Sequence, residues 1–409
     1  MLLLLLMMVI YTSLSAQRSL KGKVTTSDTH KPVALANVYL SNTAVGTITG
    51  ENGEFVIESF PEGRFDLVVS FIGYETFTTT VQSAKLPSFL EIVIKPKVDV
   101  LQEVIVSPYE KNGWEKWGRT FTDYFIGTSA NAADCKLLNA EVLKFRHNKK
   151  TNTLSAFADE TLVIENNALG YRLKYDLTKF EYHFSTGLLY YQGYPFFEDM
   201  EAKSKRLNRK WHARRDDCYY GSVMHFMRSF YRNTLSQEHF EVRRLIRISA
   251  AEKKRVRGIF QEQVAKNSMG RIIMLDADAF GPDVHKDSVN YYLKVMRQPE
   301  KLNVLIDQKL PGDSIGFGVD STTAGLYFTD YLQVIYTAKK IPNEYALFSR
   351  QPPGIPLRSE LTLPADKEVH VLANGLYYEG FDLLTLGYWA WSEKIANMLP
   401  YEYKPLKKE

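Results

Sequence analysis

The segment Gly46–Phe55, which reads GTITGENGEF, carries a strong local signal for the structure of the N-terminal part of the chain. Asn52-Gly53 is typical of a tight hairpin turn, because glycine has no Cβ and asparagine tolerates positive φ. After this turn, Phe55 and Ile57 alternate with polar residues, so both point to one face of a strand. The segment therefore predicts two antiparallel strands joined by a tight turn.

The same pattern extends outward in both directions. LKGKVTT begins at Leu20, Pro61-Glu62-Gly63 supplies a turn, and FDLVVSFIGYETFTTTVQ reads as two strands around Gly73. FLEIVIKP closes the set, because a proline at Pro96 bars a longer strand. Short strands at this spacing predict an all-β sandwich over residues 17–107.

Several of these stretches resemble the carboxypeptidase regulatory-like domain. The stretches are GKVTT, ANVYL, GTITGENGEF, LVVSFIGYE and LQEVIVSP. The resemblance implies a transthyretin-like (immunoglobulin-like) sandwich. In that family the module often opens TonB-dependent outer-membrane transporters of the starch-utilisation type. It implies a structural or docking module of the Gram-negative cell envelope.

Peptidase activity does not follow from that resemblance. A metallocarboxypeptidase needs an H-x-x-E pair and a second, distant histidine around zinc. None of the 8 histidines is followed by glutamate at the third position, and Glu241 follows His239 at the second. The chain also has no P-loop, C-x-x-C pair or dinucleotide fingerprint. We therefore expect no enzyme activity, no cofactor and no metal.

The first residues predict export. Residues 1–16 form an apolar run that ends in small and polar residues, with Ala16 before Gln17, as in a signal peptide. No later segment is apolar enough for a transmembrane helix in the mature chain. We expect a periplasmic or outer-membrane-associated protein, with a linker over residues 108–118 and a second domain over residues 119–409.

That second domain reads as α+β, with antiparallel strands and central basic helices. Apolar residues recur at helical spacing over residues 220–231, and Ser249 with Glu252 forms a capping box before a second helix. Residues 287–382 read as strands, SVNYYLKVM among them, and a last helix is expected at residues 391–399. YPFFEDM, GSVMHFMRSFYRNTL and WAWSEKIANMLP resemble a family of envelope proteins without an assigned activity.

Charge is concentrated in the central helices. Residues 203–257 hold 16 Lys/Arg against 5 Asp/Glu, a balance of +11, which leaves −7 for the rest of a chain of net charge +4. Such a patch suits an anionic partner: an envelope protein, a polysaccharide or anionic lipid. Export argues against nucleic acid. The candidate anion-binding residues are Lys205, Arg206, Arg209, Lys210, Arg214, Arg215, Lys253, Lys254, Arg255 and Arg257.

These features favour a non-enzymatic binding or scaffolding protein of the cell envelope, and two alternatives stay open. One is a small outer-membrane barrel, since residues 139–200 contain strand-like stretches. The other is a hydrolase. Gly312–Gly316 matches G-x-S-x-G around Ser314, but no helical pattern follows, so a turn between strands is expected. The second hydrolase candidate is an acidic cluster of Asp276, Asp278, Asp283 and Asp287.

Cys135 and Cys218 are the only cysteines. In an oxidising compartment they could form one disulfide, and two buried free thiols are equally consistent with the sequence.

Overall fold

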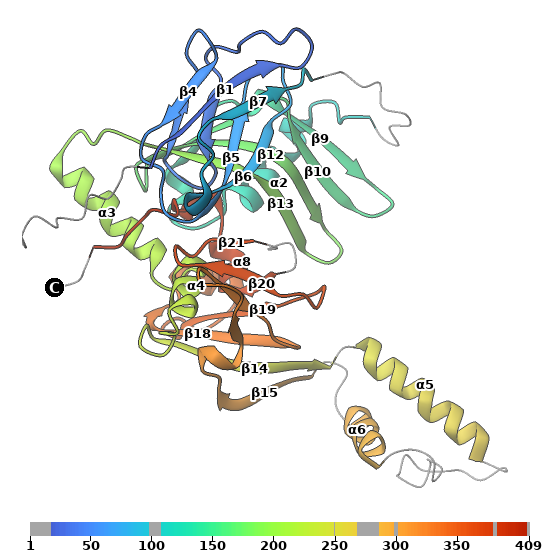
Figure 1. The fold of residues 1–409 in the computed structure, drawn as a ribbon. Helices are drawn as coiled ribbons and strands as arrows, with labels where there is room; N and C mark the ends of the chain where they lie inside the picture. Colours follow the sequence, from blue (N-terminus) through green and yellow to red (C-terminus); the bar gives the residue numbers. More distant parts are fainter. Residues whose placement is uncertain are drawn as a thin grey trace, which may run out of the picture.

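The computed structural model describes residues 18–97, 108–248, 250–267, 286–297, 302–378 and 383–406. The predicted signal peptide, residues 1–16, lies outside them. The described residues bury three large hydrophobic clusters and a smaller fourth one. Figure 1 shows the N-terminal sandwich at one end of the molecule and the C-terminal sheets at the other.

The N-terminal sandwich packs two sheets around one core. One sheet has the order β4-β1-β7, with β7 parallel to β1, and the other has the order β3-β2-β5-β6. Gly53 takes φ +74°, so the predicted turn at Asn52-Gly53 forms. The antiparallel pairing predicted for the strands on either side of it is wrong, because β3 pairs with β2 while β4 pairs with β1 in the other sheet. The predicted all-β sandwich itself is confirmed. Its strands are β1 Leu20–Thr26, β2 Asn37–Leu40, β3 Gly46–Ile48, β4 Glu54–Ile57, β5 Arg64–Ser70, β6 Phe77–Gln82 and β7 Leu90–Ile94, with a 3₁₀ turn at Ser83–Lys85.

The next unit is a helix packed on an antiparallel sheet. Strand β12 pairs with β13 along one side, while β11 and β10 pair with its two halves on the other. The elements are α2 Gly113–Phe125, β8 Cys135–Leu137, β9 Leu143–Asn148, β10 Thr153–Ala158, β11 Leu162–Asn166, β12 Tyr171–His183 and β13 Leu188–Asp199, with 3₁₀ turns at Ala132–Asp134 and Ala140–Val142.

Helix α2 begins at Gly113, inside the range expected to be a linker. Phe121 and Phe125 are fully buried, and Trp117 packs against the same core one turn earlier. Apolar side chains at this four-residue spacing form one continuous helical stripe, which extends the helix into the region expected to be a linker.

The C-terminal part is α+β with antiparallel sheets, as predicted. A five-stranded sheet has the order β15-β14-β18-β19-β22, and a four-stranded sheet has the order β16-β17-β20-β21. The predicted helix over residues 220–231 is α4, whose Phe226 and Met227 are fully buried; Tyr220 lies just outside it. The elements are α3 Lys205–Tyr219, α4 Val223–Tyr231, β14 Phe240–Ile248, β15 Leu302–Lys309, β16 Gly316–Gly318, β17 Thr323–Leu326, β18 Tyr331–Lys340, α7 Asn343–Ser349, β19 Pro356–Thr362, β20 Val369–Leu372, β21 Tyr377–Tyr378 and β22 Leu384–Gly387.

Helices α5 (Ala250–Asn267) and α6 (Lys286–Arg297) form a pair that projects from the body of the molecule (Figure 1). The strand predicted at SVNYYLKVM is wrong, since these residues lie in α6. Val289 and Leu293 stand four residues apart and pack with Val256 and Phe260 of α5. That spacing places both side chains on one helical face, and the strand preference of the tyrosines between them does not outweigh it. Ser249, the first residue of the predicted capping box, lies outside the described residues.

The chain ends in α8 (Tyr388–Ser392) and a 3₁₀ turn at Ile395–Asn397. The single helix predicted over residues 391–399 is therefore wrong in extent, because the backbone leaves the helical region at Glu393, with ψ 68°. Trp389 closes the core, where its Nε1 donates to the Gly221 carbonyl at 2.7 Å. Within the described ranges, no helix is both long and apolar enough to cross a membrane.

Candidate functional site

The ten cations predicted to form one anion-binding patch lie in two separate places. Six lie on α3 and four on α5. Figure 1 shows α3 at the left side of the body and α5 in the projecting helix pair at the opposite lower end. The tertiary structure therefore divides the patch into two basic surfaces.

The C-terminal half of α3 is fixed to the protein. Trp211 Nε1 donates to the Asn167 carbonyl at 2.9 Å. Arg215 is buried, donates to the carbonyls of Leu169 and Gly170, and pairs with Asp199 at 3.0 Å. Arg214 pairs with Asp134 at 2.7 Å. Arg214 and Arg215 thus serve to hold the helix in place.

The N-terminal half of α3 is a basic surface in solvent. Ser204 caps the helix by accepting a hydrogen bond from the Leu207 N–H at 3.2 Å. The four cations of this half are exposed, and their side chains make no hydrogen bond or ion pair with any residue that the structure describes. Spacings of four residues place them on one side of the helix. We call this set the α3 basic face; its members are Lys205, Arg206, Arg209 and Lys210.

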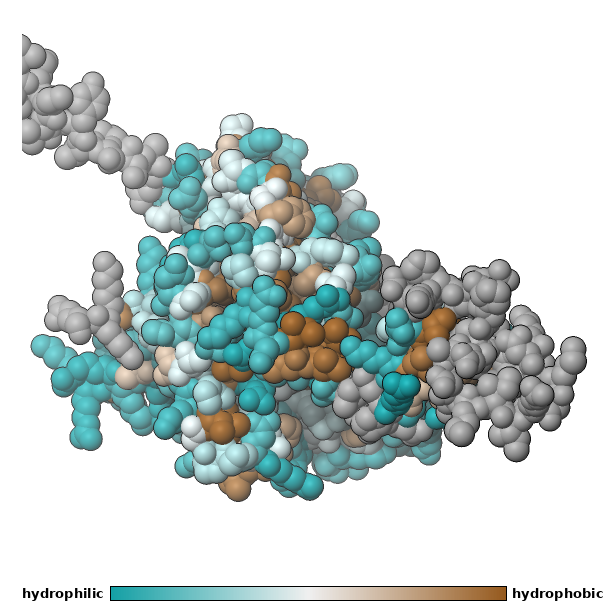
Figure 2. All heavy atoms as spheres, turned by 90° about the horizontal axis from the view of Figure 1, so that it is seen from below, coloured by the Kyte–Doolittle hydropathy of each residue, from teal (hydrophilic) through white to brown (hydrophobic). Residues whose placement is uncertain are grey.

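The surface around α3 is strongly hydrophilic. Figure 2 shows hydrophilic side chains extending from the left edge of the molecule, the side on which α3 lies in Figure 1. On α5, by contrast, Arg255 forms an ion pair with Glu252 of its own helix at 2.5 Å. The α3 basic face is therefore the better placed of the two surfaces for an anionic partner.

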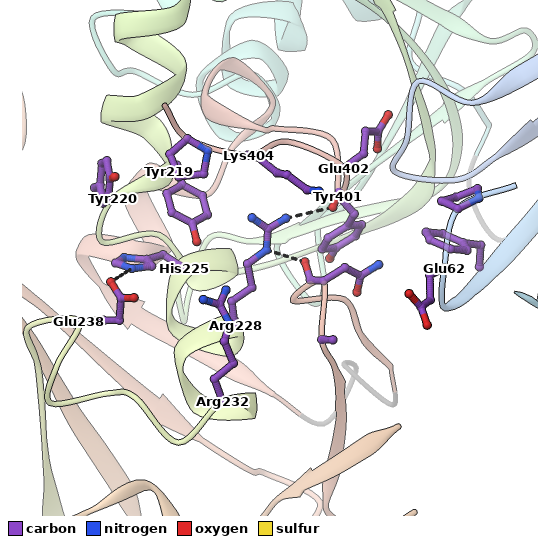
Figure 3. Close-up of a pocket in the computed structure, with 15 residues that line it drawn as sticks. Glu62, Tyr219, Tyr220, His225, Arg228, Arg232, Glu238, Tyr401, Glu402 and Lys404 are labelled. Carbon is purple, nitrogen blue, oxygen red and sulfur yellow. Dashed lines mark hydrogen bonds and ion pairs between the residues drawn. The ribbon is translucent and has the colours of Figure 1, made fainter. Parts of the chain in front are cut away.

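A pocket of 530 Å³ lies at the C-terminal end of α3 (Figure 3). Its walls include Glu62 in the turn before β5, residues of α3 and α4, and the C-terminal segment around Tyr401 and Lys404. Sequence analysis did not find this site, because its residues are far apart in the chain.

His225 and Glu238 form one wall of the pocket. The His225 Nδ1 accepts a hydrogen bond from the Gly221 N–H at 3.2 Å, so Nε2 carries the proton and donates to Glu238 Oε2 at 3.2 Å. Burial lowers the pKa of His225 to about 4, although the bond to Glu238 opposes this shift. The imidazole is therefore neutral at physiological pH, and both of its nitrogens are already engaged.

Arg228 holds the C-terminal segment against α4. It is buried, and its guanidinium donates to the carbonyls of Asn374 at 2.8 Å, Tyr403 at 2.8 Å and Tyr401 at 3.0 Å. Its only sequence signal is an arginine within the apolar stripe of α4. A cation at such a position needs buried acceptors, which only the folded chain supplies.

The hydrolase candidates do not assemble a site among the described residues. Ser314 lies in a 3₁₀ turn, Gly312–Ser314, between β15 and β16, and its Oγ donates to the Pro311 carbonyl at 2.7 Å. The predicted turn between strands is confirmed. Asp276, Asp278 and Asp283 lie outside the described residues, and Asp287 falls in α6.

Cys135 and Cys218 are free thiols. Both contact Asn131: its Nδ2 donates to Cys218 Sγ at 3.2 Å, and Cys135 Sγ donates to its carbonyl at 3.4 Å. The disulfide alternative is therefore not the one that the structure adopts.

Comparison with known proteins identifies the N-terminal sandwich. Residues 20–106 match the CarboxypepD_reg-like domain family, so this part of the chain is a carboxypeptidase regulatory-like domain. The chain is 32% identical over 97 residues to TonB-dependent receptor P39 of Formosa agariphila, which covers 24% of this chain and 9% of the receptor. It is 34% identical over 110 residues to TonB-dependent receptor SusC of Bacteroides thetaiotaomicron, which covers 26% of this chain and 10% of the receptor. The chain thus matches about a tenth of the length of either receptor.

Proposed function

We propose that this chain is a non-enzymatic binding or scaffolding protein of the bacterial cell envelope, and that the α3 basic face contacts an anionic component of that envelope. The observation that carries the proposal is the pairing pattern of α3. Its C-terminal half is fixed by Trp211, Arg214 and Arg215, while the four cations of its N-terminal half have no partner among the described residues. A rigid, one-sided row of cations raises the local concentration of an anionic polymer or surface.

The envelope location is supported by the N-terminal domain. The two relatives that share it are both TonB-dependent receptors, a class of outer-membrane protein. The apolar residues 1–16, which read as a signal peptide, point the same way.

A role without catalysis is supported by the groups that a reaction would need. Both nitrogens of His225 are engaged, by Gly221 and Glu238. The Ser314 hydroxyl donates its hydrogen bond to the backbone carbonyl of Pro311, and it has no histidine partner among the described residues. A serine nucleophile and its histidine base must lie within hydrogen-bonding distance of each other, and Ser314 and His225 do not.

The proposal is tested by binding of the full chain to phosphatidylglycerol vesicles, phosphatidylcholine vesicles and polygalacturonate, at about 50 mM and about 500 mM salt, since surface charge interactions are screened over this range. Binding to an anionic partner at low salt and its loss at high salt are expected. One variant replaces the α3 basic face by glutamine at Lys205, Arg206, Arg209 and Lys210. The matched control removes the same charge from α5, at Lys253, Lys254, Arg255 and Arg257.

The α3 variant should bind at least about tenfold more weakly, a change of about 1.4 kcal/mol. The α5 variant should bind like the unmodified protein. Absence of binding to both anionic partners at low salt contradicts the proposal, and a loss confined to the α5 variant assigns the contact to the projecting helices. Binding to phosphatidylglycerol vesicles would indicate a lipid partner, and binding to polygalacturonate would indicate a polysaccharide partner.

A further inference from the structure

We propose that the pocket between the regulatory-like domain and α4 binds a small organic molecule that carries a carboxylate or phosphate group, and that Arg232 and Lys404 hold this group. The pocket shares no residue with the α3 basic face, so this site is distinct from the proposed envelope contact.

The cations that line the pocket are not paired with carboxylates among the described residues. Arg228, Arg232 and Lys404 line the same hollow, as Figure 3 shows. Arg228 is buried and bonded to three carbonyls, but it has no carboxylate partner among the described residues. The side chains of Arg232 and Lys404 make no hydrogen bond or ion pair with any residue in the described ranges.

The carboxylates of the pocket are largely committed to other partners. Glu238 accepts from His225 at 3.2 Å, and Glu402 accepts from the backbone N–H of Ala44. Glu62 alone among the lining carboxylates has no partner in the described part of the chain. None of these three carboxylates pairs with Arg232 or Lys404 among the described residues, so the donors of both cations remain available to an oxyanion ligand.

The side chains present suit recognition of an oxyanion. A guanidinium offers planar, paired donors that match a carboxylate or phosphate, and an ammonium adds a compact charge. Arg232 is the residue that caps the C-terminal end of α4, four positions after Arg228. The fixed positive charge of Arg228 therefore attracts the same oxyanion without any movement of its side chain. Arg232 and Lys404 are exposed and can adjust to the ligand.

The remaining walls favour a ligand with a ring. Tyr219, Tyr220 and Tyr401 line the pocket, and flat tyrosine faces pack well against sugar or aromatic rings. The volume of 530 Å³ falls within the range of about 300–1,000 Å³ that is usual for small-molecule sites. One six-membered ring with its charged substituent fits such a space.

A ligand in this pocket would contact both the regulatory-like domain and the C-terminal part of the chain. Glu62 belongs to the regulatory-like domain, whereas Arg232 and Lys404 belong to the C-terminal part. Because such a ligand binds only when these parts are together, its binding should also raise the unfolding temperature.

The test uses three probes that share one ring: glucuronate, glucose 6-phosphate and glucose. Binding to the full chain is measured by titration calorimetry and by the shift in unfolding temperature. We expect saturable binding of at least one charged probe and none of glucose. The two charged probes separate a carboxylate ligand from a phosphate ligand.

The variant Arg232→Gln/Lys404→Gln should bind the charged probe at least about tenfold more weakly, while its own unfolding temperature stays unchanged, because both side chains are exposed and unpaired among the described residues. The control Arg206→Gln/Lys210→Gln removes the same charge from the α3 basic face and should leave probe binding intact. The proposal is overturned if neither charged probe binds saturably up to about 10 mM. A dissociation constant of that size corresponds to a binding free energy of about 3 kcal/mol. Equal binding of glucose, or an equal loss in the control, does so as well.

Discussion

The hydroxyl of Tyr39 donates a hydrogen bond of 3.0 Å to Oδ2 of Asp176, and this bond crosses from the regulatory-like domain to the sheet that follows it. Both residues are buried. Around this bond, the Asn42 N–H donates to the Pro195 carbonyl at 2.7 Å, and the Phe197 N–H donates to the Thr43 carbonyl at 2.9 Å. The domain is therefore joined to β13 by backbone hydrogen bonds and to β12 by this buried pair.

Replacement of Tyr39 by phenylalanine should destabilise the protein by about 1–3 kcal/mol, because it removes a donor from a buried carboxylate while the ring stays in place. Urea unfolding of the full chain measures the loss. Tyr74→Phe is the control in the same domain, since the Tyr74 hydroxyl makes no hydrogen bond with a described residue. If Tyr39→Phe and Tyr74→Phe are equally stable, the pair does not stabilise the junction.

Gly170→Ala should detach α3 from the sheet. Gly170 has φ +71°, and a Cβ at this position would lie 2.2 Å from the Trp211 ring, which anchors the helix. Backbone strain and the clash together should cost about 2–4 kcal/mol. Gly187→Ala separates the two effects, because Gly187 has φ +70° and open space around it. That control should lose about 1 kcal/mol, and an equal loss in both variants would rule out the Trp211 clash.

Glu393 should make the stability depend on pH. Burial raises the pKa of Glu393 to about 7, against the hydrogen bond that its carboxylate accepts from the Val223 N–H at 3.1 Å. The folded state binds this proton more tightly than the unfolded chain, where the pKa is near the ordinary value of 4.5. The contribution is therefore fully present below about pH 4.5 and is lost as the pH rises toward 7, on the order of 2–3 kcal/mol.

This loss is checked by urea unfolding of the protein and of Glu393→Gln at several pH values between about 4 and 8, the range in which a carboxyl with such a shift titrates. Burial of His225, whose pKa is lowered to about 4, adds stability as the pH rises over the same range in both proteins. The decline caused by Glu393 is therefore measured as the difference between the two proteins, and the glutamine variant should lack this contribution. Below about pH 7 Lys394 contributes little, because burial lowers its pKa only to about 8. A decline of the same size in both proteins would show that other groups cause it.

Cys135 and Cys218 should react slowly with thiol reagents in the folded protein. Burial raises the pKa of each thiol to about 12, so almost no thiolate is present at about pH 8. Absorbance of a disulfide reagent measures the rate in native buffer and in urea, where both thiols should react fast. Rapid modification of either cysteine without denaturant contradicts this prediction.

Local signals were enough to predict the N-terminal domain. Asn52-Gly53 sets a turn and Phe55 with Ile57 sets a strand face, and each of these depends on residues only a few positions apart. The same holds for α4, whose apolar spacing predicts the helix. The strand predicted at SVNYYLKVM was wrong because local signals there fit two structures. Its residues favour a strand but also form one helical face, and contact of that face with Val256 and Phe260 of α5 selects the helix.

Three features follow from neighbouring residues alone: the β-sandwich, the excess of cations between residues 203 and 257, and the lack of an H-x-x-E motif. The positions of those cations on the surface, by contrast, depend on the tertiary structure. It divides them between α3 and α5, commits Arg215 to the carbonyls of Leu169 and Gly170, and gathers Glu62, Arg232 and Lys404 around one pocket. Such placements depend on contacts between distant segments, which form only when the separate cores pack together.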